Sequence, residues 1–244
     1  GGIVSPPYYK AILFDLYGTL AGFDPPREQI QIIAGRLHGI ELDPEGILEG
    51  YGEADDFMSA QNAVEPMRKM NVKELASFFA AYEQIILRHG GHEVELKTAG
   101  EIWATVRRQE YGLTPFADTI PVLDQLRESG RMVGVVSNMS DSGDKIARQI
   151  GLSEHIDFLI TSRDAGANKP HPPIFLQSLE RAHCTPDEAI LIGDSIDSDV
   201  EGAFAVGIKP ILIDRDHRYR SYKTHPRITS LDELEALLTE LEAS

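Results

Sequence analysis

The chain has 244 residues, enough to bury a sizeable core as one large domain or as a domain with a smaller insert. Its net charge of -16 disfavours nucleic acid and anionic membranes as partners, so an anionic substrate needs a local positive site. The single cysteine excludes an internal disulfide and fits a reducing cytoplasm. No apolar run approaches the ~20 residues of a membrane span. We expect a cytoplasmic protein and assign residues 1–7 no role in the fold.

The first predicted element is a short buried strand at residues 11–14. Its four apolar residues are followed by Asp15, and Gly18 and Thr19 then allow the backbone to turn sharply. In open parallel α/β sheets, ligands bind in the crevice at the carboxyl ends of the strands. Asp15 is therefore a candidate active-site residue, with a helix cap or a loop anchor as the alternative role.

Residues 21–26 break regular structure and predict a hinge. Beyond them, apolar residues recur at helical spacing and indicate about four helices, with no strand signal among them. We interpret residues 25–111 as a helical cap domain, and residues 8–24 together with 112–244 as the catalytic core.

From residue 114 onward, predicted helices alternate with buried strands. The strands are expected at residues 132–136, 158–160, 189–192 and 210–213, and the helices at residues 118–129, 141–150, 172–183 and 199–206. A last helix is expected to begin at Ser230, which has the spacing of a capping box with Glu233. Alternating strands and helices imply a parallel sheet covered on both faces. The expected fold class is α/β, with a doubly wound parallel-sheet (Rossmann-like) core and an inserted four-helix cap domain.

Polar residues follow four predicted strands at the point where each strand ends. They are Asp15, Ser137 with Asn138, Lys169, and Asp194 with Asp199. Each of them alone has an ordinary explanation, such as a helix cap, a solvated lysine or a turn. Because the carboxyl ends of parallel strands share one edge of a sheet, we expect these side chains to converge.

This arrangement resembles the haloacid dehalogenase-like hydrolase superfamily from residue 12 to about residue 214. The resemblance rests on residues 15–20, 137–138, 162–164, 169–170 and 193–203. The helical insert also lies where many members carry an α-helical cap. The resemblance implies that Asp15 is a nucleophile that forms a covalent aspartyl intermediate. It also implies a binding site for the anionic group of the substrate, made by Gly18, Thr19, Ser137, Asn138 and Lys169, with Lys169 offsetting clustered negative charge.

Tyr17 departs from the phosphatases of this superfamily, which carry an aspartate there that protonates the leaving oxygen and then activates water. Tyrosine has an ordinary pKa of about 10 and is a poor base near neutral pH. Haloacid dehalogenases carry a tyrosine at this position, and a halide leaving group needs no proton. Those enzymes also bind their substrate with an arginine of the cap. Residues 41–62, where we would expect it, contain no arginine, although Arg27, Arg36 and Arg68 flank this stretch.

The last motif favours a phosphatase. Asp194 and Asp199 are expected near Asp15, and carboxylates this close repel an anionic substrate unless a cation lies among them. Mg²⁺ prefers oxygen ligands and commonly binds together with substrate phosphate. We expect its ligands to be Asp15, the backbone carbonyl of Tyr17 and Asp194, with Asp199 acting through water. The dehalogenases of the superfamily, by contrast, use no metal.

The sequence therefore favours Mg²⁺-dependent hydrolysis of a small phosphorylated metabolite. Two alternatives stay open, namely a metal-free 2-haloacid dehalogenase, suggested by Tyr17, and a non-catalytic phosphate-binding relative. The expected partner is a small anionic molecule, with no nucleic acid and no membrane. His171 is a candidate proton donor, with a solvent-facing loop histidine as the alternative. The sequence indicates neither the substrate nor the oligomeric state.

Overall fold

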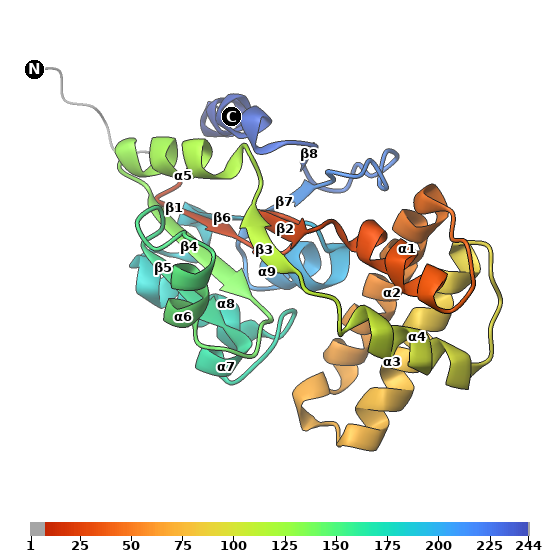
Figure 1. Ribbon diagram of the computed structural model, residues 1–244. Coiled ribbons are helices and arrows are strands. Elements are labelled where there is room, and N and C mark those ends of the chain that lie inside the picture. The colour runs from red at the N-terminus through yellow and green to blue at the C-terminus, as the bar shows by residue number, and fades with distance from the viewer. Residues whose placement is uncertain (1–7, 244) are drawn as a thin grey trace, which may run out of the picture. The chain divides into compact units, whose positions relative to one another are not determined.

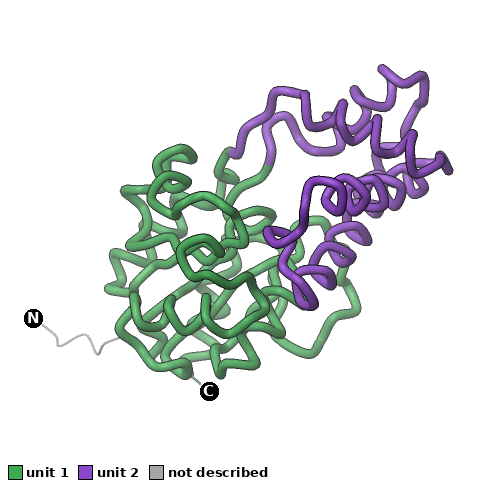
Figure 2. Tube along the Cα trace, turned by 90° about the horizontal axis from the view of Figure 1, so that it is seen from below, with its two compact units in different colours: residues 1–22, 114–244 green, residues 23–113 purple. Residues whose placement is uncertain are grey.

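The computed structural model describes residues 8–243, and the chain divides into two compact units (Figure 2). One unit contains the chain up to Gly22 and from Thr114 onward, and the other runs from Phe23 to Leu113. Each unit has its own cluster of buried apolar side chains. The expectation for residues 1–7 lies outside the described residues.

The first unit is built on a parallel sheet, as predicted. Over residues 8–243 this sheet has six strands in the order β5-β4-β1-β6-β7-β8. Their bounds are Ala11–Phe14 (β1), Met132–Ser137 (β4), Phe158–Thr161 (β5), Ala189–Gly193 (β6), Lys209–Ile213 (β7) and Arg227–Ile228 (β8). Strand β1 pairs with β4 on one side and β6 on the other, and all these pairings are parallel. The chain thus winds outward from β1 in both directions, which confirms the α/β doubly wound class.

Helices cover both faces of this sheet. They are α5 (Thr119–Glu128), α6 (Gly143–Gln149), α7 (Ser162–Ala165), α8 (Pro172–Ala182), α9 (Gly202–Ala205) and α10 (Leu234–Glu242). In Figure 1, α5 and α10 lie above the sheet and α8 lies below it. Phe175 of α8 is fully buried in one core cluster with Leu13 of β1 and Leu191 of β6. Ser230 and Glu233 form the predicted capping box ahead of α10.

Several short elements differ from the sequence predictions. Strand β8 was not predicted, because two residues are too few to show the alternation that identifies a strand. The expected hinge contains β2 (Ala21–Asp24), which pairs with β3 (Gly112–Pro115) in a two-stranded sheet. The helix expected from residue 199 begins earlier, as a π-helical segment at Ile196–Glu201 that leads into α9.

The second unit is helical between β2 and β3. Its helices are α1 (Arg27–Leu37), α2 (Pro44–Val64), α3 (Val72–His89) and α4 (Leu96–Val106), with a 3₁₀ segment at Met67–Lys69. Ile47, Ile86 and Ile102 have no exposed surface and lie in the same buried cluster, so α2, α3 and α4 share one apolar core. Within residues 8–243, no helix combines the length and apolar character required to cross a membrane.

Candidate active site

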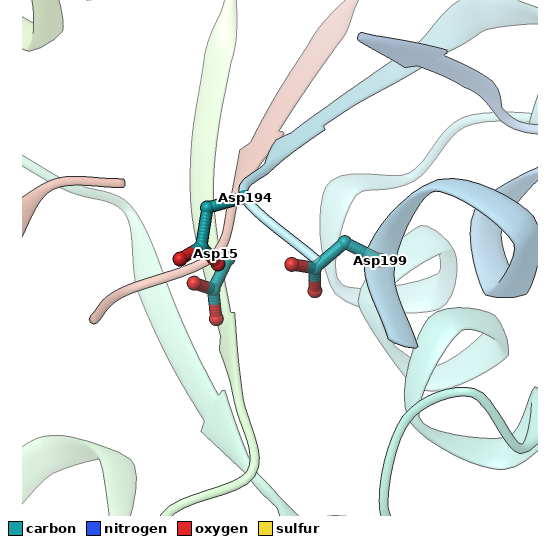
Figure 3. Close-up of side chains that lie close together, drawn as sticks. All are labelled: Asp15, Asp194 and Asp199. Atoms are coloured by element: carbon teal, nitrogen blue, oxygen red, sulfur yellow. The ribbon is translucent and has the colours of Figure 1, made fainter. Parts of the chain in front are cut away.

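Three aspartates meet at the carboxyl edge of the sheet. Asp15 follows β1 directly, Asp194 follows β6, and Asp199 lies in the segment that leads into α9. One carboxylate oxygen of each lies within 4.8 Å of the others. Figure 3 shows the carboxylate of Asp199 turned toward those of Asp15 and Asp194. Residues that are far apart in the sequence therefore form one acidic cluster.

Lys169 supplies the positive charge beside this cluster. Its Nζ donates hydrogen bonds to Oδ1 of Asp15 at 2.6 Å and to Oδ1 of Asp199 at 2.6 Å. A third bond goes to the carbonyl of Val136 at 2.9 Å, so all three ammonium protons have acceptors. The Lys169 side chain is only 3% exposed. The lysine therefore joins the nucleophile candidate to a second carboxylate within a buried ionic network.

Burial and charge shift the pKa values of this network. Burial raises the pKa of Asp15 to about 6, and the charge of Lys169 opposes this rise while that of Asp199 adds to it. Burial alone would lower the pKa of Lys169, but the charges of Asp15 and Asp199 raise it above the ordinary value for lysine. Lys169 is therefore protonated, and its positive charge favours the ionised form of Asp15, which is the form that a nucleophilic carboxylate would need.

The turn after Asp15 brings two further candidates to the cluster. Oγ1 of Thr19 donates to Oδ2 of Asp15 at 3.3 Å, and Thr19 is fully buried. Gly18 has a positive φ of 81°, and a Cβ atom there would lie 2.1 Å from Oδ2 of Asp194. Any other side chain at position 18 would therefore displace the carboxylate of Asp194, so glycine is required by both conformation and space.

The segment around Asp199 is equally close-packed. Oδ2 of Asp199 accepts a hydrogen bond from the backbone N–H of Ser195 at 3.1 Å. A Cβ atom at Gly193 would lie 2.4 Å from the side chain of Asp199. Gly193, which the sequence analysis did not select as a site residue, is thus needed for the approach of Asp199. Its position immediately before Asp194 is the signal that could have identified it.

Ser137 and Asn138 lie at the end of β4, on the same edge. Ser137 is buried, and its Oγ accepts from the backbone N–H of Met139 at 3.3 Å. The side-chain amide of Asn138 forms two hydrogen bonds to the backbone of Lys169. Its Oδ1 accepts from the Lys169 N–H at 2.7 Å, and its Nδ2 donates to the Lys169 carbonyl at 3.2 Å. In this structure Asn138 therefore positions the Lys169 loop, and substrate contacts by Ser137 and Asn138 stay predictions.

Tyr17 and His171 are both half-buried. The backbone of Tyr17 forms an isolated β-bridge with Ala21, which closes the turn after Asp15. The role of the Tyr17 carbonyl as a metal ligand stays a prediction. The backbone N–H of His171 donates to the carbonyl of Asn168 at 2.9 Å, immediately before α8.

Arg215, which was not among the residues predicted from the sequence, contacts the turn after Asp15. Its Nη2 donates to the carbonyl of Thr19 at 2.7 Å, and its Nε donates to the same oxygen at 3.1 Å. Arg215 follows β7 closely, so the rule that identified Asp15 and Asp194, a polar residue just after a strand, is the signal that could have found it.

The donor set fits a divalent cation. Three carboxylates face one ammonium group, so negative charge remains in excess at the edge. The available donors are oxygen atoms, which Mg²⁺ prefers, and the carboxylate of Asp194 lies against Gly18. Asp15, Asp194 and Asp199 are therefore the residues that would hold such an ion.

The fold and the acidic cluster define an α/β protein whose clustered carboxylates lie at the carboxyl ends of a parallel sheet. A sequence profile of the haloacid dehalogenase-like hydrolase family matches residues 9–207, and the chain belongs to this family. It is therefore a hydrolase.

Two relatives carry the names of phosphatases. The chain is 28% identical over 209 residues to the glyceraldehyde 3-phosphate phosphatase of Methanopyrus kandleri, covering 84% of each chain. It is 27% identical over 216 residues to the ribulose-1,5-bisphosphate 5-phosphatase of Halopiger xanaduensis, again covering 84% of each. The solved structure of the L-2-haloacid dehalogenase from Xanthobacter autotrophicus shares the fold, with a TM-score of 0.59, 18% identity, and coverage of 94% of this chain and 98% of that one.

Proposed function

We propose that this hydrolase is a Mg²⁺-dependent phosphatase that acts on a small phosphorylated metabolite, with Asp15 as the nucleophile. The observation that carries this proposal is the cluster of Asp15, Asp194 and Asp199 within 4.8 Å. A metal-free dehalogenase would have to bring the carboxylate of a haloacid beside these like charges. The two relatives named as phosphatases support the same choice.

In the proposed reaction, an oxygen of Asp15 attacks phosphorus, and the bond between phosphorus and the ester oxygen breaks. The bonding electron pair leaves with the ester oxygen, and an aspartyl phosphate remains on Asp15. Water then hydrolyses this intermediate, which releases inorganic phosphate and regenerates the carboxylate. The hydrogen bonds from Lys169 and Thr19 orient the Asp15 carboxylate for the attack.

Bound Mg²⁺ would offset the negative charge of the phosphate. Asp15, the Tyr17 carbonyl and Asp194 would hold it, with Asp199 acting through water. The remaining positive charge for the phosphate comes from Lys169, and Gly18, Thr19, Ser137 and Asn138 complete the proposed substrate site.

Tyr17 limits the choice of substrate. With no carboxylic acid at this position, the leaving oxygen takes its proton from solvent, from the substrate itself or from His171. The proposal therefore favours a leaving group that departs readily or that carries its own proton donor.

Dehalogenation is the second candidate, and Tyr17 is the residue that favours it. It requires an arginine for the halide and the carboxylate, and two of the candidates are already engaged within the second unit. Nη1 of Arg27 donates to Asp55 at 2.7 Å, and the guanidinium of Arg27 lies 4.3 Å from the ring centroid of Tyr51. Arg36 is paired with Glu41.

The test is a panel of phosphate esters and 2-haloacids, assayed with Mg²⁺ or with a chelator. We expect phosphate release that needs Mg²⁺ and that Asp15→Asn abolishes while the fold is kept. Asp197→Asn is the matched control, because Asp197 is exposed in the segment that contains Asp199. Haloacid turnover without metal would establish the dehalogenase instead, and a chain that turns over neither class would be the non-catalytic relative.

Calorimetry tests the metal separately. We expect millimolar Mg²⁺ to bind and to raise the melting temperature, because a ligand that binds only the folded state stabilises it. Asp194→Ala should weaken this binding more than Asp199→Ala does. Absence of binding at that concentration would refute the metal assignment.

A further inference from the structure

The turn that follows Asp15, residues 16–21, is closed by its own backbone. The carbonyl of Leu16 accepts from the N–H groups of Leu20 at 2.8 Å and Ala21 at 3.0 Å, and Gly18 donates to the carbonyl of Ala21 at 2.9 Å. The carbonyls of Thr19 and Leu20 receive donors from outside the turn, because buried backbone oxygens need hydrogen-bond partners. What binds these two carbonyls therefore determines how firmly the turn is held.

The carbonyl of Leu20 is bound by the segment at the start of α5. Its carbonyl accepts from Oγ1 of Thr119 at 2.6 Å and from the backbone N–H of Phe116 at 2.9 Å. One of these donors is a backbone N–H group and the other is a buried hydroxyl. The carbonyl of Leu20 is therefore rigidly supported.

The carbonyl of Thr19, by contrast, is bound by a single side chain. The guanidinium of Arg215 donates to the Thr19 carbonyl from Nη2 at 2.7 Å and from Nε at 3.1 Å. Its other edge forms a bidentate pair with Asp118, with both N–O distances at 2.9 Å. Its face lies 4.2 Å from the ring centroid of Phe116. The guanidinium is thus held on three sides, which gives the hydrogen bonds to Thr19 a fixed direction.

Asp118 is itself fixed by the chain that precedes α10. It accepts from Oγ of Ser230 at 3.0 Å and from the backbone N–H of Leu231 at 2.9 Å. Burial alone would raise the pKa of Asp118, but the hydrogen bonds from Arg215 and Leu231 outweigh burial and hold it below the ordinary value. Asp118 therefore keeps the charge that orients Arg215. Residues 215, 230 and 231 lie beyond residue 207, where the family match ends.

We propose that Arg215 is a positioning residue for catalysis, which holds the Thr19 carbonyl so that the Thr19 hydroxyl and Asp15 keep their reactive geometry. The inference rests on the proposed function of Asp15 as nucleophile. Thr19 connects the two groups, because its carbonyl is bound by Arg215 while its Oγ1 donates to Oδ2 of Asp15 at 3.3 Å. A displaced Thr19 would misdirect Asp15, whereas Ser137, Asn138 and Lys169 of the proposed substrate site would keep their places, so the effect should fall mainly on kcat.

The experiment compares Arg215→Ala, Arg215→Lys and a matched control, Arg131→Ala. Arg131 forms a similar pair, with Nη2 at 2.8 Å and 3.0 Å from the carboxylate oxygens of Glu242, and it precedes β4 at the opposite edge of the sheet. The side chains of Arg131 and Arg215 are 13% and 18% exposed, so both substitutions remove a comparable ion pair. Steady-state kinetics and amide hydrogen exchange of residues 16–21 are measured for each variant with the best phosphate ester of the panel.

We expect Arg215→Ala to lower kcat by about 10- to 100-fold with little change in KM, since a misplacement of about 1 Å can cost 100-fold. Exchange at residues 16–21 should become faster while exchange in β1 stays slow. Added guanidinium ion should restore part of kcat in Arg215→Ala. Arg215→Lys should retain an intermediate kcat because one charged nitrogen atom, that of the lysine ammonium group, can still donate. Arg131→Ala should change neither kcat nor the exchange of the turn.

Equal kcat values for wild type, Arg215→Ala and Arg131→Ala would overturn the inference and leave the proposed function intact. The same holds if exchange at residues 16–21 is unchanged. If the wild type releases no phosphate from any ester, the proposed function fails by itself, and hydrogen exchange still decides whether Arg215 orders the turn. If Arg215→Ala does not fold, Arg215→Lys provides both measurements.

Discussion

Replacing Lys169 by methionine tests the ionic network at the centre of the site. Methionine has a similar length and no charge, so it fills the space and removes the three hydrogen bonds to Asp15, Asp199 and the Val136 carbonyl. The side chains of Lys169 and Asp199 are 3% and 2% exposed, so this ion pair is shielded from bulk water. Two buried carboxylates would be left beside Asp194 without their cation.

The expected cost follows from this burial. Removing one partner of a buried ion pair costs about 3–5 kcal/mol, because the remaining charge stays buried and uncompensated. Lys169→Met leaves two carboxylates without their cation, so we expect the free energy of unfolding to fall by an amount near the upper end of that range. Domains are commonly stable by about 5–15 kcal/mol, so the variant should remain folded but be strongly destabilised.

Urea unfolding at neutral pH, with a chelator and then with Mg²⁺, measures this cost. Mg²⁺ should recover part of the lost stability, because a cation among the three carboxylates replaces the missing charge. Lys10→Met is the control: its partner is Glu188, its side chain is 51% exposed, and pairs of this kind are worth about 0–1 kcal/mol. A loss no larger in Lys169→Met than in Lys10→Met would refute the view that Lys169 holds the acidic cluster together.

Two further substitutions have defined outcomes. Tyr17→Asp should supply the missing acid and raise hydrolysis of phosphate esters with poor leaving groups, by up to the roughly 10²–10⁴-fold that a general acid–base group contributes. The gain should be smaller for p-nitrophenyl phosphate. Loss of a haloacid activity would instead identify a dehalogenase. Glu83 is fully buried, and burial raises its pKa to about 8 against the hydrogen bond from Gln31. Its contribution to stability is complete below its unfolded pKa of about 4.3 and is lost as pH rises toward 8, by roughly 1 kcal/mol per pH unit. Glu83→Gln should flatten that slope in urea unfolding between pH 5 and 8, and an unchanged slope would count against a buried neutral Glu83.

The class of fold and the strand-end residues of the candidate site could both be predicted from the sequence. Buried apolar runs alternating with helical segments indicate a parallel sheet, because each strand must return over the sheet through a helix. Asp15, Ser137 and Asp194 were identified as candidates because each directly follows or ends such a run. The capping box of Ser230 was equally readable, since it depends on residues only three positions apart.

The convergence of the strand ends was expected, but only the folded structure shows which atoms form bonds there. Lys169 reaches Asp15 across 154 positions, and Arg215 reaches Thr19 across 196. Contacts at such separations leave no periodic pattern in the sequence, because they arise from how the strands and loops pack. Asn138 shows the same limit: its place at the end of β4 was predictable, but its bonds to the backbone of Lys169 were not. The chemistry at each strand end is local, whereas the hydrogen bonds that orient it depend on the packing of the whole sheet edge.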